Sequence, residues 1–155
     1  MGYSDFVITY GDDTAGTAHH EGVILALQRA THGTLRLLAA RLADEDLAAS
    51  EINALASLAD GRVRSVGELA ADTGTKPTTL TSVLDRLTRR GLVTRETDQA
   101  DRRSFLVDLT DEGRRVARAA RAAMTDIEAE ALSAVGPADL TGFYAVTSAL
   151  AEASR

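Results

Sequence analysis

Apolar residues recur at helical spacing along most of the chain and at strand spacing in one short stretch. The first apolar stripe predicts a long helix from about Thr17 to Ala43 and comprises Ile24, Leu27, Thr31, Leu35, Leu38 and Leu42. After Gly91 the period changes, and segments 92–96 and 105–109 are predicted to form two short strands. In the second, Phe105, Val107 and Leu109 alternate with polar or edge positions. The polar residues between them, 97–103, are expected to form the long loop of a hairpin.

Capping residues set the other boundaries. Ser50 suits an N-cap, Ser65 and Glu68 have the spacing of a capping box, and Pro77 suits a first helical turn. Thr110 is a further N-cap, because the two acidic residues after it favour a helix N-terminus. Glycines end most of the helical stretches. The predicted helices span residues 51–59, 66–73, 77–90, 111–135 and 137–153.

The middle elements follow the order helix, helix, turn, helix and hairpin, which is typical of a helix-turn-helix followed by a wing. The predicted fold class is therefore mainly α with a small β-wing. We expect a winged helix-turn-helix DNA-binding lobe over residues 47–110 and a helical dimerisation region over residues 18–46 and 111–155. Residues 1–17 form an N-terminal arm, for which the sequence leaves open disorder or a short strand.

The predicted helix 77–90 has an apolar side and a polar side. The apolar side, expected in the core, carries Leu80, Val83, Leu84 and Leu87. The DNA major groove admits one helix, in which hydroxyl and guanidinium groups contact phosphates and base edges. The predicted DNA contacts of this helix are Lys76, Thr78, Thr79, Thr81, Ser82, Arg86 and Arg89. The alternative is a capped surface helix with common polar residues, which leaves the hairpin unexplained.

The hairpin places arginines where a core salt bridge is unfavourable. Arg102 and Arg103 lie at the predicted loop tip, and Arg95 lies on the first strand. A guanidinium held out from the body suits the narrow minor groove, where the potential is most negative. Asp98 or Asp101 is expected to form a salt bridge that holds one wing arginine in place. A simple turn in which Asp101 pairs with Arg103 is compatible with the same residues.

Charge is distributed unevenly along the chain. The formal net charge is −6, yet residues 62–121 carry thirteen Lys or Arg and nine Asp or Glu, whereas the rest carries four and fourteen. A basic middle between acidic ends favours a partner that carries phosphates. A solvated, charged helix surface explains the same distribution, so charge alone does not decide between the two.

Several classes of function are excluded by composition. The chain has no cysteine, which rules out disulfides, thiolate catalysis and Cys-ligated zinc. It has no apolar run long enough to cross a bilayer and no signal peptide, so a cytoplasmic protein without a membrane partner is expected. No catalytic motif or phosphate loop is present, so we expect neither an enzyme nor a cofactor. The adjacent His19 and His20 would point about 100° apart on a helix, so no metal site is predicted.

The stretch from residue 79 to 113 resembles the signature region of MarR-type regulators, the multiple antibiotic resistance regulator family. The resemblance rests on spacing, and the matching residues are Thr79-Leu80, Ser82, Leu87, Gly91-Leu92-Val93, Asp101-Arg102-Arg103, Thr110 and Gly113. Thr88 departs from the family, which usually has Glu, Ile or Val there. Ser82 is often an arginine in relatives, which implies a different operator.

The resemblance implies a homodimer in which segments 17–43, 111–135 and 137–153 interdigitate. The long amphipathic end helices agree with this, although an ordinary monomeric helical core is the alternative. Such a dimer is expected to bind a palindrome of roughly 15–20 base pairs. It would act within the nucleoid, most often as a repressor of its own or a neighbouring operon. Release from DNA by a small aromatic or phenolic ligand is also typical of the family. Some members of the family are activators.

Candidates for the ligand site are few. Arg36 suits a carboxylate, His32 lies one helical turn away from it, and Tyr144 offers a hydroxyl. For each of the three, a surface or interface role is the more common explanation. A rival hypothesis for the whole chain is a winged helix protein-interaction scaffold without specific DNA binding. Ion pairs that tie up the arginines of the helix and wing would favour that scaffold.

Overall fold

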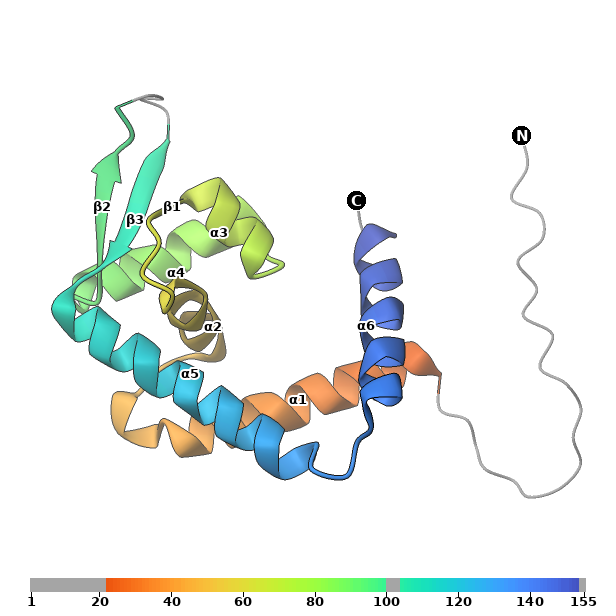
Figure 1. Ribbon diagram of the computed structural model, residues 1–155. Coiled ribbons are helices and arrows are strands. Elements are labelled where there is room, and N and C mark those ends of the chain that lie inside the picture. The colour runs from red at the N-terminus through yellow and green to blue at the C-terminus, as the bar shows by residue number, and fades with distance from the viewer. Residues whose placement is uncertain (1–21, 100–103, 154–155) are drawn as a thin grey trace, which may run out of the picture.

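The computed structural model describes residues 22–99 and 104–153 and shows a mainly α-helical chain with a small antiparallel sheet (Figure 1). The predicted arm, residues 1–17, lies outside the described residues. The elements are α1 (Val23–Arg41), the short 3-10 helix η1 (Ala43–Glu45), α2 (Ala49–Leu58), β1 (Arg64–Ser65), α3 (Val66–Asp72), α4 (Pro77–Arg89), β2 (Val93–Thr97), β3 (Phe105–Leu109), α5 (Asp111–Ala131) and α6 (Pro137–Glu152). This arrangement confirms the predicted fold class.

The lobe formed by α2, α3, α4 and the sheet surrounds one apolar core. Strand β3 lies in the middle of the sheet and pairs antiparallel with β1 on one side and β2 on the other. The apolar side of α4 is buried as predicted, with Leu80, Val83, Leu84 and Leu87 all at most 4% exposed. These side chains pack against residues of α2, α3, the sheet and the first turns of α5. The core therefore fixes the polar side of α4 outward.

Local capping follows the sequence at two helices and departs from it at a third. Ser65 Oγ accepts a hydrogen bond from the Glu68 amide at 3.2 Å, and Thr110 Oγ1 accepts one from the Gly113 amide at 2.9 Å, as predicted. Helix α2 instead begins at Ala49, so the prediction that Ser50 is its N-cap is wrong. The reason is the Glu51 carboxylate, which accepts a hydrogen bond from the Ala48 amide at 2.8 Å.

The other boundaries differ from the sequence prediction by a few residues. Strand β1 was not predicted, because two residues are too few to show an alternating pattern. Helix α5 ends at Ala131 and not at residue 135, since Leu132 leaves the helical conformation at φ −103°. Helix α1 is described from Val23 onward and ends at Arg41, close to its predicted end.

A second, smaller core joins the lobe to the long helices. It comprises Leu38, Leu42, Ile52, Ala56, Ala120, Ala123 and Ile127, from α1, α2 and α5. Helices α2 and α5 therefore contribute to both cores. In Figure 1, α5 runs from the base of the wing toward α1 and α6. Helix α2 thus connects the rest of the lobe with the long helices.

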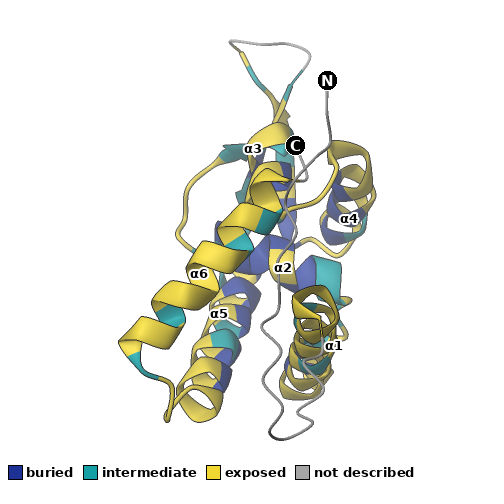
Figure 2. Cartoon of the chain, turned by 90° about the vertical axis from the view of Figure 1, so that its right-hand side faces the viewer, coloured by how far each residue is buried: buried dark blue, intermediate teal, exposed yellow. Residues whose placement is uncertain are grey.

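Helices α1 and α6 leave most of their apolar residues exposed. Helix α6 has no buried residue, and α1 buries only Leu38 (Figure 2). Phe143 is 52% exposed and Ile24 is 59% exposed. The predicted stripe of α1 is thus fully buried only at its C-terminal end, because α6 leaves an open hollow beside the N-terminal half of α1.

Candidate nucleic-acid interface

The polar side of α4 is open to solvent at its N-terminal end. Lys76, Thr78, Thr79 and Ser82 are exposed, and within the described chain their side chains make no hydrogen bond or ion pair. Thr81 Oγ1 donates to the Pro77 carbonyl oxygen at 2.9 Å, which leaves its lone pairs outward. Pro77 at the first helical position fixes the start of the helix. This end of α4 therefore offers hydroxyls and one ammonium group to a partner.

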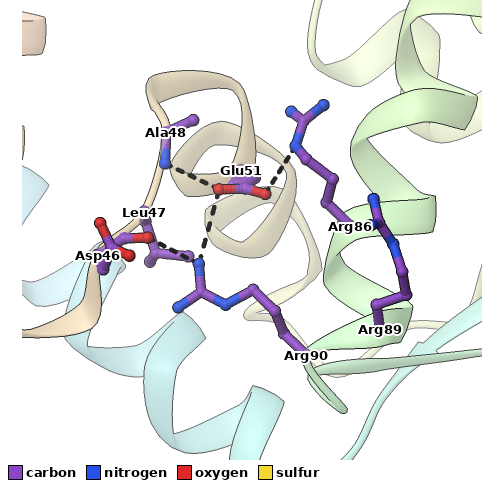
Figure 3. Close-up of a pocket in the computed structure, with 7 residues that line it drawn as sticks. All are labelled: Asp46, Leu47, Ala48, Glu51, Arg86, Arg89 and Arg90. Carbon is purple, nitrogen blue, oxygen red and sulfur yellow. Dashed lines mark hydrogen bonds and ion pairs between the residues drawn. The ribbon is translucent and has the colours of Figure 1, made fainter.

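Arg86, a predicted DNA contact, bonds to a carboxylate of α2. Its Nε donates to Glu51 Oε1 at 3.0 Å (Figure 3). Its Nη2 lies 3.4 Å from Ser50 Oγ. The Glu51 side chain is only 5% exposed, whereas that of Arg86 remains 41% exposed. Burying a carboxylate is costly unless it is paired and hydrogen-bonded, so this contact holds α4 against α2. Arg86 thus has a positioning role as well as an exposed edge.

Arg90 completes this contact and was not singled out in the sequence. It donates to the carbonyl oxygens of Asp46 at 2.7 Å and Glu45 at 2.5 Å, and its Nη1 lies 3.8 Å from Glu51 Oε2. In Figure 3 the side chain turns toward Glu51 and Asp46. The signal that could have revealed it is the buried acidic position on α2, which requires a cation nearby.

Arg89 differs from its two neighbours. Its Nε donates to the Asp85 carbonyl oxygen at 3.3 Å, and within the described chain it pairs with no carboxylate. Together with Arg86 and Arg90 it lines an open pocket of about 580 Å³ (Figure 3). Among the arginines of α4, Arg89 therefore has its charge most available for an external phosphate.

At the base of the wing, Arg95 is held within the protein. It forms an ion pair with Asp85 of α4, and its guanidinium carbon lies 5.9 Å from the centre of the Phe105 ring. The Arg95 side chain is 20% exposed. This pair connects the wing to α4, so the DNA contact predicted for Arg95 would have to compete with it.

The wing tip itself lies outside the described residues. Arg102, Arg103 and Asp101 belong to the segment 100–103, and the predicted salt bridge of the wing with Asp98 or Asp101 therefore stays a prediction. The described part of the hairpin closes where the Asp98 amide donates to the Ser104 carbonyl oxygen at 3.0 Å. In Figure 1, β2 and β3 carry this end of the described hairpin away from the helices of the lobe.

Other basic residues of the middle segment are neutralised internally. Arg64 binds Asp60 and Asp72, each at 2.7 Å, and its guanidinium holds the pKa of Asp60 well below the usual range. Arg115 bonds to both Glu112 and Glu45, and its hydrogen bonds lower the pKa of each of these carboxyls. The basic excess of the sequence is thus partly balanced at close range, which argues against a uniformly positive surface.

The predicted ligand residues do not gather in one place. His32 Nδ1 donates to the Gln28 carbonyl oxygen at 2.7 Å, Arg36 is exposed on α1, and Tyr144 is 65% exposed beside Phe143. None of the three lines the groove of about 360 Å³ that α1, α2, α5 and α6 enclose. Its polar lining consists of Thr31, Thr34, Asn53 and Glu128. Sequence patterns missed these residues, because they come from three helices.

Two kinds of feature were searched for across residues 22–99 and 104–153. No three His, Asp or Glu side chains gather there closely enough to hold a metal ion. No helix in the same ranges combines the length and apolar character of a bilayer span.

Comparison with known proteins shows that this chain is similar to MarR-family regulators. The sequence profile of the MarR family matches residues 45–104, which form most of the lobe. Bordetella bronchiseptica BpsR, whose DNA binding is regulated by 6-hydroxynicotinic acid, is similar at 25% identity over 84% of this chain and 98% of BpsR, with a TM-score of 0.70. CouR from Rhodococcus jostii RHA1, bound to p-coumaroyl-CoA, is similar in fold, with a TM-score of 0.75, 23% identity, and coverage of 88% of this chain and 96% of CouR.

A structure of overoxidized AbfR bound to DNA is also similar in fold. Its TM-score is 0.68 at 20% identity, over 85% of this chain and 91% of AbfR. No curated protein matches the sequence.

Proposed function

We propose that this chain, whose residues 45–104 match the MarR family, binds a palindromic DNA operator as a homodimer and represses its own or a neighbouring operon. A small aromatic or phenolic ligand would relieve the repression by favouring a dimer whose two lobes are spaced incorrectly for DNA. This proposal includes no catalytic step and no cofactor.

The observation that carries the proposal is the exposed N-terminal end of α4. Its lysine and hydroxyl side chains make no contact that would occupy them within the described chain, while the opposite side of the helix is buried in the lobe core. A helix fixed in this way can enter the major groove, with hydroxyls at phosphates and thymine methyls and Arg89 at a phosphate. Arg102 and Arg103 are proposed to enter the adjacent minor groove.

Dimerisation is supported by the exposed faces of α1 and α6. Exposed apolar residues in one patch are typical of a protein interface. Val23, Phe143 and Val146 line one hollow between α1 and α6, and Ile24 and Leu25 of α1 are also exposed. A two-fold axis through these helices would present two copies of α4 to successive turns of DNA. The operator would then be a palindrome.

The proposal is tested by selecting duplexes from a random pool with the full-length protein. Affinity for the selected duplex would be measured by fluorescence anisotropy at two salt concentrations. We expect a palindrome and a steep loss of affinity with salt, since several phosphates are neutralised per dimer. Failure to enrich any sequence, with a flat salt response, would favour the protein-interaction scaffold.

The double variant Arg102→Ala/Arg103→Ala tests the wing. Each substitution should weaken operator binding by about 1–3 kcal/mol without unfolding the protein. The matched control, Arg118→Ala/Arg121→Ala, removes the same charge from α5 and should leave the selected sequence unchanged. Equal affinity of wild type and wing variant would refute the role of the wing.

A further inference from the structure

We propose that the groove between α1, α2, α5 and α6 selects a ligand with an apolar or aromatic body and a cationic, hydrogen-bond-donating head. The inference rests on the proposed function, because it names the chemistry of the ligand that would control DNA binding. The groove has a volume of about 360 Å³, which is in the range of small-molecule sites. The nature of its lining decides which head group it accepts.

The hydroxyl groups of the groove are available only as acceptors. Thr31 Oγ1 donates its proton to the Leu27 carbonyl oxygen at 2.9 Å, and Thr34 Oγ1 donates to the Ala30 carbonyl oxygen at 2.8 Å. Each hydroxyl has one proton, so only lone pairs remain for a ligand. Two of the four polar side chains in the lining therefore favour a donor.

The only charged side chain that lines the groove, among the described residues, is Glu128. Its carboxylate makes no ion pair within the described chain, so its charge is not neutralised by a neighbouring arginine. A carboxylate accepts hydrogen bonds and donates none when ionised. The side-chain amide of Asn53 is the hydrogen-bond donor among the polar side chains that line the groove. A ligand carboxylate would thus meet one amide donor and one like charge.

The rest of the lining suits the body of an aromatic or alkyl amine. Leu27, Leu38, Met124 and Ile127 supply apolar surface, and Phe143 supplies an aromatic ring. An ammonium group gains from both a carboxylate and an aromatic face. The groove continues along α1 and α6, where a neighbouring hollow of about 330 Å³ shares Leu27, Ala30 and Phe143. The body can therefore extend into a mainly apolar hollow, in which Thr147 is the only polar lining residue among those described.

Arg121 is the nearest described cation on the same helix, and it belongs to a different cleft. It lies two helical turns from Glu128, a rise of about 10 Å. The cleft that it lines, of about 200 Å³, shares Asn53 and Met124 with the groove but also contains Asp72. A carboxylate bound to Arg121 would therefore leave the apolar groove for a polar cleft, in which Asp72 is already paired with Arg64 at 2.7 Å.

Matched ligands and variants test the head group directly. Tyramine, tyrosol and 4-hydroxyphenylacetate share a phenol and differ chiefly in a positive, neutral or negative head. Their affinities for the full-length protein would be measured by titration calorimetry without DNA, so that the result does not depend on operator binding. We expect tyramine to bind at least tenfold more tightly than 4-hydroxyphenylacetate, with tyrosol between them.

The variant Glu128→Gln should remove most of this preference, and Glu128→Lys should reverse it. Glu130→Gln is the matched control, because Glu130 lies on the same helix but pairs with Arg41 at 2.7 Å. Tighter binding of 4-hydroxyphenylacetate, or a preference unaffected by Glu128→Gln, would overturn the proposal. Binding of none of the three would also overturn it and would indicate that a second copy of the chain fills the groove.

The effect on DNA is measured separately. If the wild-type protein binds its selected duplex, tyramine should release it at concentrations that follow the calorimetric affinity, and Glu128→Gln should need at least tenfold more. Tight tyramine binding with no DNA binding at all would contradict the proposed function but not the head-group preference. DNA binding with no effect of bound tyramine would contradict the controlling role of the groove.

Discussion

The winged helix lobe and the α1–α6 helices differ in how completely one chain buries their apolar residues. In the lobe, Leu55, Leu69 and Leu84 are each 0% exposed, and every secondary structure element contributes to the closed core or its sheet. In α6, by contrast, no residue is buried, and Tyr144 and Phe143 remain more than half exposed (Figure 2). The lobe is complete within the chain, whereas the long helices are not.

This difference separates the stability of the folded lobe from the stability of the assembly formed by the long helices. Burial of apolar area is the main favourable contribution to folding, so the lobe can hold α4 and the wing in place by itself. The apolar faces of α1 and α6 are stabilised in the same way only when another protein surface packs against them and buries them. Substitutions in the lobe should therefore act on folding, and substitutions in α6 should act on assembly.

The largest expected effect is that of Gly113→Ala, at the junction of the wing and α5. A Cβ atom on Gly113 would lie 1.8 Å from the Leu92 carbonyl oxygen, and backbone cannot yield as a flexible side chain does. We expect the free energy of unfolding to fall by about 3 kcal/mol or more. Chemical denaturation measures this loss.

The control for this substitution is Gly67→Ala, also within a helix, where the nearest atom is 4.0 Å from the added Cβ. It should be neutral or stabilise by up to about 1 kcal/mol. Equal stability of Gly113→Ala and wild type would show that the junction is looser than the structure indicates.

A smaller effect is expected at the contact between α2 and α4. Glu51→Ala leaves the Ala48 amide and Arg86 without their acceptor and should destabilise the lobe by about 2 kcal/mol. Glu51→Gln keeps an acceptor and should cost less. Denaturation of both variants gives the comparison.

A double-mutant cycle of Glu51→Ala and Arg86→Ala distinguishes positioning from direct contact with DNA. If Arg86 acts through Glu51, the operator affinities should be non-additive by about 1 kcal/mol. Additive losses, together with a smaller salt dependence for Arg86→Ala alone, would instead indicate that Arg86 contacts a phosphate.

Assembly is tested by Val146→Asp on α6. Val146 is 43% exposed within one chain, and a charge at an apolar interface should weaken the dimer at least tenfold, about 1.4 kcal/mol. Analytical ultracentrifugation at several concentrations measures the effect. Val63→Asp is the control, because Val63 is 50% exposed on the lobe and should leave the dimer intact. Equal dimer affinity in both variants would contradict an interface on α6.

The smallest effect on stability is expected for Arg89→Ala. Arg89 pairs with no carboxylate within the described chain, so the free energy of unfolding should change by at most about 0.5 kcal/mol. If Arg89 neutralises a phosphate, the slope of log affinity against log salt should fall by about one per protomer. An unchanged slope would remove Arg89 from the proposed interface.

The sequence predicted the helices of the lobe because their signals are local. The apolar residues of α4 repeat with the helical period, and capping by Ser65 and Thr110 depends on amides three residues away. The second wing strand was predicted from alternation and the first from the change of period after Gly91, whereas β1, with only two residues, was not predicted. The predicted N-cap of α2 was wrong because Glu51, and not Ser50, accepts the hydrogen bond of the free Ala48 amide.

Periodicity, capping and spacing therefore determined the fold class, the resemblance to the MarR family and the outward face of α4, since each depends on residues close together in sequence. Only the tertiary structure decided which arginines are paired with carboxylates of the same chain, because Arg86 and its partner Glu51 are 35 residues apart. The acceptor-rich groove was likewise decided there, as Thr31, Asn53 and Glu128 come from three helices. Electrostatic partners depend on distance in space, and a one-dimensional pattern contains no record of that distance.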